Sequence, residues 1–195
     1  MKIVVIGLGY VGLTLALTLS DVGFKVEGID KDSRKISKLN IGQPTLYEAK
    51  IQTILLNALE SNSITFHENI SKSNDNRIFI VSVGTPIDDL SNPLIGNLEN
   101  AVKEVGQNLR KGDTVIVRST VPVGTTRTVV KKILEDESGL NAASEFSLAS
   151  APERTLQGLA LEELRNLSQI IGGIDEKSIE NAVSIFNKIT RTIVR

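Results

Sequence analysis

The stretch that decides the fold is KIVVIGLGYVG, residues Lys2–Gly12. Its first half is a nearly unbroken apolar run, which is typical of a strand buried on both faces of a parallel sheet. Its second half places glycines in the spacing G-x-G-x-x-G. We expect Gly7 to form a tight turn, Gly9 to let the backbone approach a pyrophosphate, and Gly12 to let the next helix pack against the strand. The N-terminus of that helix would then face the phosphates.

The rest of the chain repeats the alternation of short apolar runs and longer segments with helical spacing. Strands are expected at Lys2–Ile6, Lys25–Ile29, Ile64–Phe66, Arg77–Val83, Thr114–Arg118 and Glu145–Ala149. Helices are expected at Tyr10–Val22, Ser33–Leu39, Tyr47–Glu60, Leu98–Leu109, Thr125–Glu137 and Glu176–Lys188. Before the last of these helices come the segment Leu159–Leu167 and a short apolar run, Gln169–Ile171. Right-handed crossovers between such strands predict an α/β fold, a doubly wound parallel sheet of the Rossmann type in three α/β/α layers.

The organisation of the chain predicts one domain. No Pro/Ser-rich linker, repeat or low-complexity tract interrupts the 195 residues, so we expect residues 1–195 to form a single dinucleotide-binding domain. The glycine pair Gly172-Gly173 is expected to close the last apolar run before the final helix. Thr192–Arg195 has the pattern of a strand that is only beginning, so we expect the domain to be truncated before its architecture is complete.

Composition and charge exclude several classes of protein. The 22 Lys and Arg residues balance 23 Asp and Glu residues and are scattered, which predicts no nucleic acid and no membrane surface as a partner. No stretch approaches the roughly 18 apolar residues of a membrane span, and no signal peptide is recognisable, so a cytoplasmic location is expected. The absence of Cys and the presence of one His, His67, predict no metal site.

An acidic residue follows the second predicted strand at the position that a ribose-binding carboxylate needs. Asp30 lies 18 residues after Gly12, close to the spacing of about 20 in dinucleotide-binding domains. A carboxylate there accepts from a ribose 2′-hydroxyl and repels a 2′-phosphate, which favours NAD over NADP. Lys31, Arg34 and Lys35 follow at once and could offset part of that repulsion.

Three further clusters each follow the carboxyl end of a predicted strand. They are Gly84-Thr85-Pro86, Ser119–Thr126 and Ala151–Arg154. In open parallel sheets the ligand crevice lies outside these ends, so Thr85, Thr120 and the Glu153/Arg154 pair are expected to line one cleft. Taken singly, each cluster could instead be a turn or a helix cap. Their common position on the side of the glycine loop favours a ligand cleft.

Together these motifs resemble, in order, the N-terminal domain of the UDP-glucose/GDP-mannose dehydrogenase family. The resemblance rests on Gly7–Leu13, Val83–Pro86, Arg118–Thr126 and Pro152–Arg154, and it spans essentially the whole chain. The Pro-Glu-Arg segment, followed by GLALEEL at residues 158–164, is most similar to the branch that oxidises UDP-N-acetylhexosamines, notably UDP-N-acetyl-mannosamine. The glucose branch typically has Phe after the Glu and a second acid where this chain has Gln157.

The resemblance implies roles for individual residues. The expected catalytic residues are Glu153, which would position water or a proton near the reacting carbon, and Thr120. The expected substrate-binding residues are Arg154 and Thr155, which would reach the nucleotide sugar. The expected NAD-binding residues are Gly7, Gly9, Tyr10, Val11, Gly12, Asp30, Lys35, Thr85 and Thr120.

The resemblance also implies the chemistry. Family members transfer two hydrides from a UDP-sugar to NAD and hold the intermediate aldehyde on a cysteine before forming the acid. That Cys and a central-helix Lys would lie beyond residue 195, so the chain is expected to be truncated before the central helix and the C-terminal substrate domain. We therefore expect this chain alone to be inactive and the full-length form to be a homo-oligomer. Of a Glu-Pro-Gly turn found in many relatives, only Glu48 is retained.

Two other functions fit parts of the sequence. One is a stand-alone NAD-binding module without catalysis, which the absence of a thiol nucleophile suggests. The other is a dehydrogenase of the hydroxyacid or 6-phosphogluconate type, which needs one hydride transfer and no Cys. The Ser119–Thr126 and Pro152–Arg154 segments argue against the second alternative.

Overall fold

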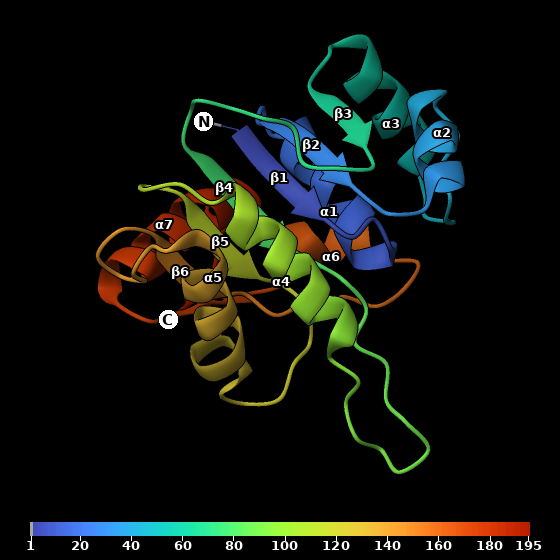
Figure 1. Ribbon diagram of the computed structural model, residues 1–195. Helices are drawn as coiled ribbons and strands as arrows, with labels where there is room; N and C mark the ends of the chain where they lie inside the picture. Colours follow the sequence, from blue (N-terminus) through green and yellow to red (C-terminus); the bar gives the residue numbers. More distant parts are fainter. Residues whose placement is uncertain (1) are drawn as a thin grey trace.

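The computed structural model describes residues 2–195 and has a mixed sheet with helices on both faces (Figure 1). The seven strands of the sheet lie in the order β3-β2-β1-β4-β5-β6-β8, and those from β3 to β6 are parallel. The strands are β1 (Lys2–Ile6), β2 (Lys25–Ile29), β3 (Ile64–His67), β4 (Arg77–Val81), β5 (Thr114–Val117), β6 (Ser147–Ser150) and β8 (Gly172–Gly173). This is the doubly wound order, which confirms the predicted fold class.

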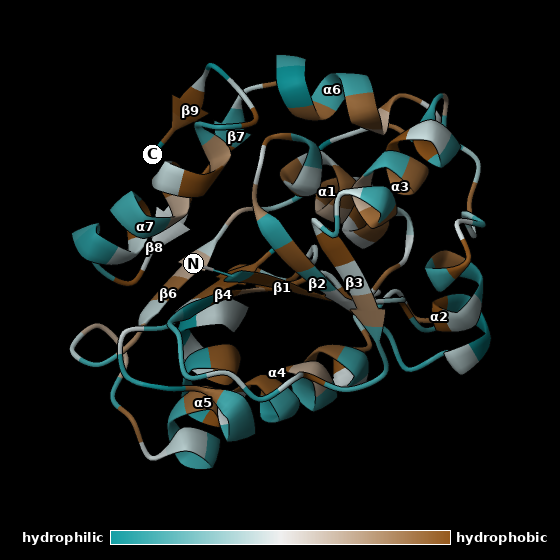
Figure 2. Ribbon diagram, turned by 90° about the horizontal axis from the view of Figure 1, so that it is seen from above, coloured by the Kyte–Doolittle hydropathy of each residue, from teal (hydrophilic) through white to brown (hydrophobic). Residues whose placement is uncertain are grey.

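The helices form two layers that enclose the sheet (Figure 2). One layer contains α1 (Tyr10–Asp21), α3 (Ile51–Glu60), α6 (Ala160–Asn166) and α7 (Glu176–Phe186). The other contains α4 (Gly96–Asn108), the π-helical turn η1 (Thr126–Val130) and α5 (Lys131–Ser138), while α2 (Ser33–Asn40) lies beside β3. No helix within residues 2–195 is long and apolar enough to cross a membrane.

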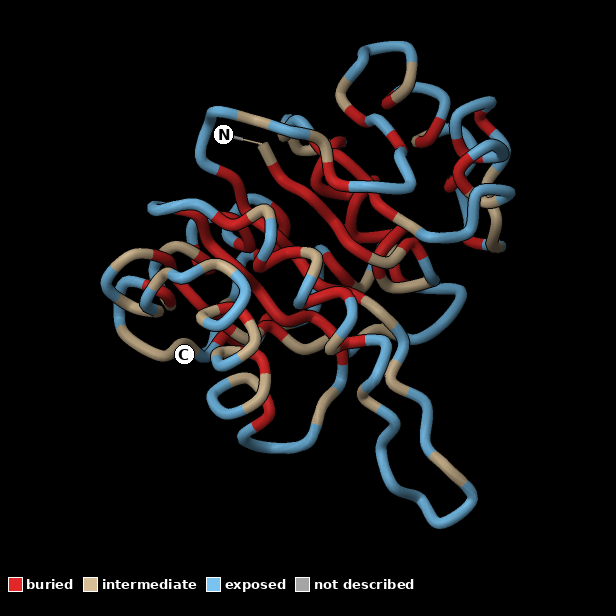
Figure 3. Tube along the Cα trace, viewed as in Figure 1, coloured by how far each residue is buried: buried red, intermediate tan, exposed pale blue. Residues whose placement is uncertain are grey.

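The first strand is buried on both faces, as its apolar run predicts. Ile3 and Val5 belong to the apolar cluster under α1, whereas Val4 and Ile6 belong to the cluster under α4. Successive side chains of a strand point to opposite faces, so β1 supplies both layers of the core, and the central strands are the most deeply buried part of the chain (Figure 3).

Several predicted boundaries are wrong for identifiable reasons. The predicted helix Tyr47–Glu60 begins only at Ile51, because Lys50 has a left-handed backbone (φ 65°) that no α-helix accommodates. The predicted strand Arg77–Val83 ends at Val81, where Ser82 and Val83 turn into the loop before α4. The strand predicted at Glu145–Ala149 begins two residues later and ends one residue later, at Ser147–Ser150.

The C-terminal edge of the sheet also differs from the prediction. Gly172-Gly173 does not close an apolar run but forms β8, which pairs antiparallel with β6, so the sheet is not wholly parallel. The segments Gln169–Ile170 (β7) and Ile193–Val194 (β9) pair with each other in a separate two-stranded sheet. Pairing between short segments so distant in sequence has no local pattern that predicts it.

The packing of α1 on the glycine loop gives a first prediction. A methyl group at Gly12 would lie 1.8 Å from the carbonyl oxygen of Gly7, whereas one at Gly9 would meet no atom within 4 Å. We expect Gly12→Ala to lower the free energy of unfolding by about 3 kcal/mol, since backbone must move to admit the methyl group. Gly9→Ala, the matched control, should cost less than about 1 kcal/mol. Urea unfolding measures both, and equal losses would contradict this account.

Candidate functional site

The glycine loop leaves the N-terminus of α1 open to an anion. Gly7 has a positive φ of 88°, and Gly9, the N-cap of α1, has no side chain to cap the first turn. The unpaired N–H groups of that turn and the positive end of the helix dipole face the same way. Because nothing lies within 4 Å of a methyl group built on Gly9, the loop offers a cradle that a Cβ atom would partly fill.

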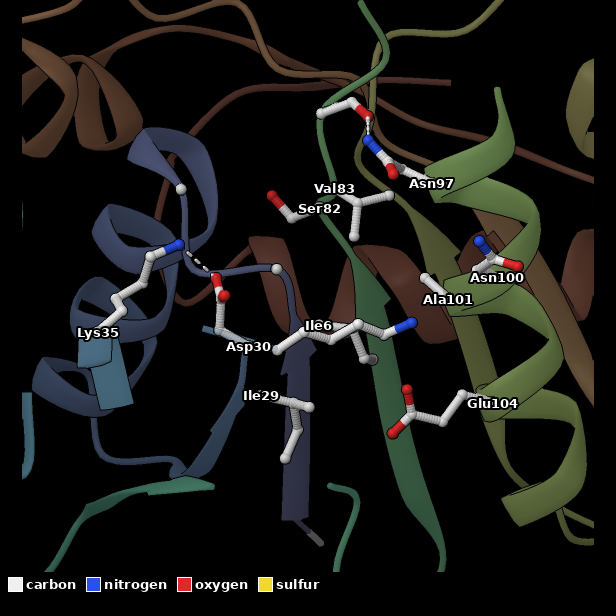
Figure 4. A pocket seen from close by; sticks show the side chains of 14 residues that line it. Ile6, Ile29, Asp30, Lys35, Ser82, Val83, Asn97, Asn100, Ala101 and Glu104 are labelled. Carbon is white, nitrogen blue, oxygen red and sulfur yellow. Dashed lines mark hydrogen bonds and ion pairs between the residues drawn. The ribbon is translucent and has the colours of Figure 1, made fainter. Parts of the chain in front are cut away.

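Two cavities meet at this loop. The first, of about 290 Å³, lies between the carboxyl ends of β1 and β2 and helix α4 (Figure 4). The second, of about 220 Å³, lies over the carboxyl ends of β4 and β5. Four residues line both cavities: Gly9, Ser82, Val83 and Gly84. An elongated ligand can therefore cross the glycine loop with one half in each cavity.

Asp30 and Lys35 form one wall of the first cavity, as Figure 4 shows. The Lys35 Nζ atom lies 2.6 Å from Asp30 Oδ2, which also accepts from the backbone N–H of Leu8 at 2.8 Å. Asp30 Oδ1 accepts from the N–H of Asp32 at 3.0 Å. These contacts fix the carboxylate beside the glycine loop and leave it part of its acceptor capacity, which suits a pair of ribose hydroxyls.

A buried hydroxyl marks the junction of the two cavities. Ser82 Oγ is shielded from solvent and has no hydrogen-bond partner in the part of the chain that the structure describes. Buried polar atoms normally have a partner, so a ligand or an ordered water at the junction would satisfy it. Together with the open cradle at Gly9 and the fixed carboxylate of Asp30, this orphaned atom shows that the residues present fit a dinucleotide.

The second cavity brings together residues from three strand ends. Thr85 donates from its hydroxyl to the carbonyl oxygen of Thr120 at 2.6 Å, which ties the loop after β4 to the loop after β5. Glu153, after β6, reaches the same cavity, as do Tyr10 and Val11. Thr85, Thr120 and Glu153 therefore share one cleft, as the sequence predicts, whereas Arg154 does not line it because its side chain turns to the carbonyl oxygen of Ser168.

The carboxylate of Glu153 forms an ion pair with a buried arginine. Arg118, at the end of β5, is 1% exposed and donates from Nη2 to Glu153. Its other amino group donates to the carbonyl oxygen of Ala151 at 2.9 Å and to Oε1 of Gln169 at 2.5 Å. The guanidinium also lies over the ring of Phe186, 5.3 Å from its centre.

This environment keeps Glu153 ionised. The backbone N–H groups of Arg154 and Thr155 donate to its Oε1 at 2.7 and 2.8 Å. Burial acts to raise the pKa of Glu153, but the charge of Arg118 and these donors outweigh burial and hold the pKa below its ordinary value. An ionised carboxylate is a hydrogen-bond acceptor and not a proton donor, so the geometry favours orientation of a water molecule over acid catalysis.

The hydroxyl of Tyr10 joins the glycine loop to two other segments. It donates to the carboxylate of Glu48, which is 5% exposed, and accepts from the N–H of Gly158 at 2.5 Å. Burial, together with the hydrogen bond to Glu48, raises the pKa of Tyr10, which keeps the phenol protonated and able to donate. The retained Glu48 thus anchors the loop before α3 and the loop before α6.

Arg154 and Thr155 lie outside the two cavities. The Arg154 side chain is exposed and donates to the carbonyl oxygen of Ser168 at 3.1 Å, while Thr155 Oγ1 is buried without a partner among the described residues. Both border a small cavity of about 10 Å³ behind Glu153. Gly12 is likewise outside both cavities, because it packs beneath the loop. Within residues 2–195 no group of three His, Cys, Asp or Glu residues could hold a metal ion.

Sequence reasoning missed the residues that support this site. Arg118 follows four buried strand residues, and a charge at the end of such a strand needs a counter-charge, so it could have been singled out. Glu48 stands out in the sequence only as the retained residue of a Glu-Pro-Gly turn, and Ser82 does not stand out at all. Their roles depend on contacts with Tyr10 and with the junction of the cavities.

The buried ion pair predicts a pH-dependent loss of stability on mutation. Glu153→Gln leaves the Arg118 charge buried without a counter-charge, and we expect a loss of about 3 kcal/mol or more at neutral pH. Because the folded-state pKa of Glu153 is depressed, the stabilisation is present above the unfolded value of about 4.3 and fades as the pH falls through the folded pKa. Thermal unfolding of both proteins from pH 7 to pH 3 should show the gap closing. A gap that is constant over this range would refute the ion-pair assignment.

Comparisons with known proteins agree with this geometry. The chain matches, over residues 1–190, the NAD binding domain of the UDP-glucose/GDP-mannose dehydrogenase family. It is 34% identical over its whole length to the UDP-N-acetyl-D-mannosamine dehydrogenase of Pyrococcus horikoshii, of which it covers 45%. It is also 34% identical to the UDP-glucose 6-dehydrogenase of Rickettsia prowazekii, over 92% of this chain and 40% of that protein.

Solved structures show the same relationship. A UDP-D-ManNAc dehydrogenase from Pyrococcus horikoshii superimposes with a TM-score of 0.94 at 34% identity, over 99% of this chain and 46% of that one. A GDP-mannose dehydrogenase from Pseudomonas aeruginosa superimposes with a TM-score of 0.92 at 28% identity, over 100% and 46%. The chain spans less than half the length of these relatives. It belongs to the UDP-glucose/GDP-mannose dehydrogenase family and corresponds to the NAD-binding domain of that family.

Proposed function

We propose that this chain is the NAD-binding part of a nucleotide-sugar 6-dehydrogenase that oxidises a UDP-N-acetylhexosamine, with UDP-N-acetyl-mannosamine as the first candidate. The observation that carries the proposal is the pair of cavities that share Gly9, Ser82, Val83 and Gly84, with Asp30 in one cavity and Glu153 in the other. When bound, NAD accepts a hydride from the substrate alcohol. Membership of the family favours a nucleotide sugar over a hydroxyacid as the source of that hydride.

In this proposal the dinucleotide places one half in each cavity. Asp30 and Lys35 hold the adenosine ribose, and the first turn of α1, from Tyr10 and Val11 onward, receives the pyrophosphate. Gly7 and Gly12 shape the loop beneath it. Thr85 and Thr120 lie at the other end, where the cavity includes Glu153.

Roles on the substrate side follow from the charges and contacts in the second cavity. The ionised Glu153 accepts from a water molecule near the reacting carbon, and Thr120 shapes the cavity next to it. Arg154 and Thr155 are proposed to reach the nucleotide sugar, which would require the exposed Arg154 side chain to leave its contact with Ser168. The names of several relatives support a mannosamine substrate.

Residues 1–195 are proposed to act as one dinucleotide-binding domain within a homo-oligomeric enzyme. The relatives are more than twice as long as this chain, and the chain holds no cysteine. The thiol that the second oxidation needs is therefore proposed to come from outside these residues.

The position of Asp30 predicts the choice of cofactor. Because the carboxylate lies where a 2′-phosphate would sit, we expect the chain to bind NAD at least about tenfold more tightly than NADP, a difference of about 1.4 kcal/mol. Asp30→Asn removes the charge, keeps an acceptor oxygen and should bring the two affinities closer together. Asp89→Asn, which removes the same charge from an exposed loop outside both cavities, should leave the ratio unchanged. Isothermal titration tests this, and tighter binding of NADP by the unmodified chain would exclude the role of Asp30.

The missing thiol predicts binding without formation of the acid. With NAD and UDP-N-acetyl-mannosamine, we expect this chain alone to gain thermal stability on binding NAD and to form no uronic acid, because the second oxidation needs a thiol and the chain holds no cysteine. Chromatography of the sugar products and a thermal melt of the same samples check the two parts. Steady oxidation of a UDP-sugar to its uronic acid by the isolated chain would disprove the need for a thiol from outside it.

A further inference from the structure

One wall of the first cavity has no role in the function described so far. It is formed by the face of α4 that carries Asn97, Asn100, Ala101 and Glu104. These positions are three or four residues apart, so they share one side of the helix. In Figure 4 the Glu104 carboxylate extends from α4 into the cavity, opposite the wall that holds Asp30 and Lys35.

Two of the three polar side chains of this wall, those of Asn100 and Glu104, are not used by the protein itself. Asn97 donates to the carbonyl oxygen of Gly84 at 3.4 Å. In contrast, the side chains of Asn100 and Glu104 make no hydrogen bond or ion pair with any described residue, although Glu104 is partly buried. The carboxylate of Glu104 and the amide of Asn100 therefore have no hydrogen-bonding role within the protein, and both remain available to a ligand.

The cavity between the two walls is lined largely by apolar side chains, and the exposed Lys31 also borders it. Ile6, Ile29, Val83 and Ala101 line the space between Asp30 and Glu104. A flat heterocycle attached to the ribose at Asp30 would lie against these side chains and present its edge to α4. The base is bonded to C1′ of the ribose, so a ribose held at Asp30 places its base in the same cavity.

We propose that Glu104, assisted by Asn100, reads the edge of the adenine base and selects a purine with a 6-amino group. Adenine presents an amino donor at C6 beside ring-nitrogen acceptors. Glu104 accepts from the amino group, and the Asn100 amide donates to a ring nitrogen. The inference rests on the proposed placement of the adenosine half beside Asp30, and it adds a determinant of base specificity to that placement.

The proposal separates two dinucleotides that differ only at this edge. In nicotinamide hypoxanthine dinucleotide a 6-oxo acceptor replaces the 6-amino donor and N1 carries a hydrogen, so a carboxylate placed at position 6 has no donor there. The polar group on each side is then left without a partner, and loss of such a hydrogen bond to a charged group lowers affinity by about tenfold or more.

Isothermal titration of the two dinucleotides tests the assignment. We expect the unmodified chain to bind NAD about tenfold or more tightly than the hypoxanthine analogue. In Glu104→Gln the ratio should fall to about one, because a glutamine amide can accept from an amino group or donate to an oxo group. Glu99→Gln, which removes a charge from α4 outside the cavity, is the matched control and should keep the preference.

The outcomes separate this inference from the proposed function. Equal affinity of the unmodified chain for both dinucleotides would overturn the role of Glu104 and leave NAD binding intact. If Glu104→Gln still binds NAD more tightly than the hypoxanthine analogue, the role of Glu104 is likewise overturned and NAD binding is left intact. Failure of the unmodified chain to bind either dinucleotide would overturn the proposed function, and the role of Glu104 with it.

Discussion

The structure depends on the contact between Gly12 and the carbonyl of Gly7, which no residue with a side chain could make. A methyl group at position 12 would lie 1.8 Å from that oxygen, so helix α1 can lie this close to the turn after β1 only because Cβ is absent. This close approach aims the N-terminus of α1 at the space beyond the sheet. It also places Gly9 at the junction of the two cavities.

A second constraint acts at the far side of the cleft. Arg118 is buried at the end of β5 and needs a counter-charge, and Glu153 supplies it from the loop after β6. The same pairing keeps Glu153 ionised and in the second cavity. The ion pair and the Tyr10–Glu48 hydrogen bond both reach the segment that precedes α6, so binding at the glycine loop and the shape of the proposed substrate side are physically connected.

Much of the fold could be predicted from the sequence because its signals are local. The apolar run Ile3–Ile6, the glycines after it and Asp30 each act through the backbone near them, and all lie where the pattern predicts. What could not be predicted depends on distant contacts. Gly172-Gly173 forms an antiparallel edge strand because β6 offers it a partner, and Glu48 is buried because Tyr10 reaches it. Lys50 delays the start of the expected helix Tyr47–Glu60 to Ile51 through a backbone conformation that its residue type does not predict.

The central claim is that a dinucleotide crosses the glycine loop at Gly9 and occupies both cavities. Titration of NAD into the unmodified chain and into Gly9→Ala tests it most directly. A methyl group at position 9 meets no protein atom, so it would occupy only the space assigned to the pyrophosphate. The account predicts that NAD binds Gly9→Ala at least about tenfold more weakly, a change of about 1.4 kcal/mol, while the melting temperature without ligand stays close to that of the unmodified chain. Equal affinity of both proteins for NAD would contradict it.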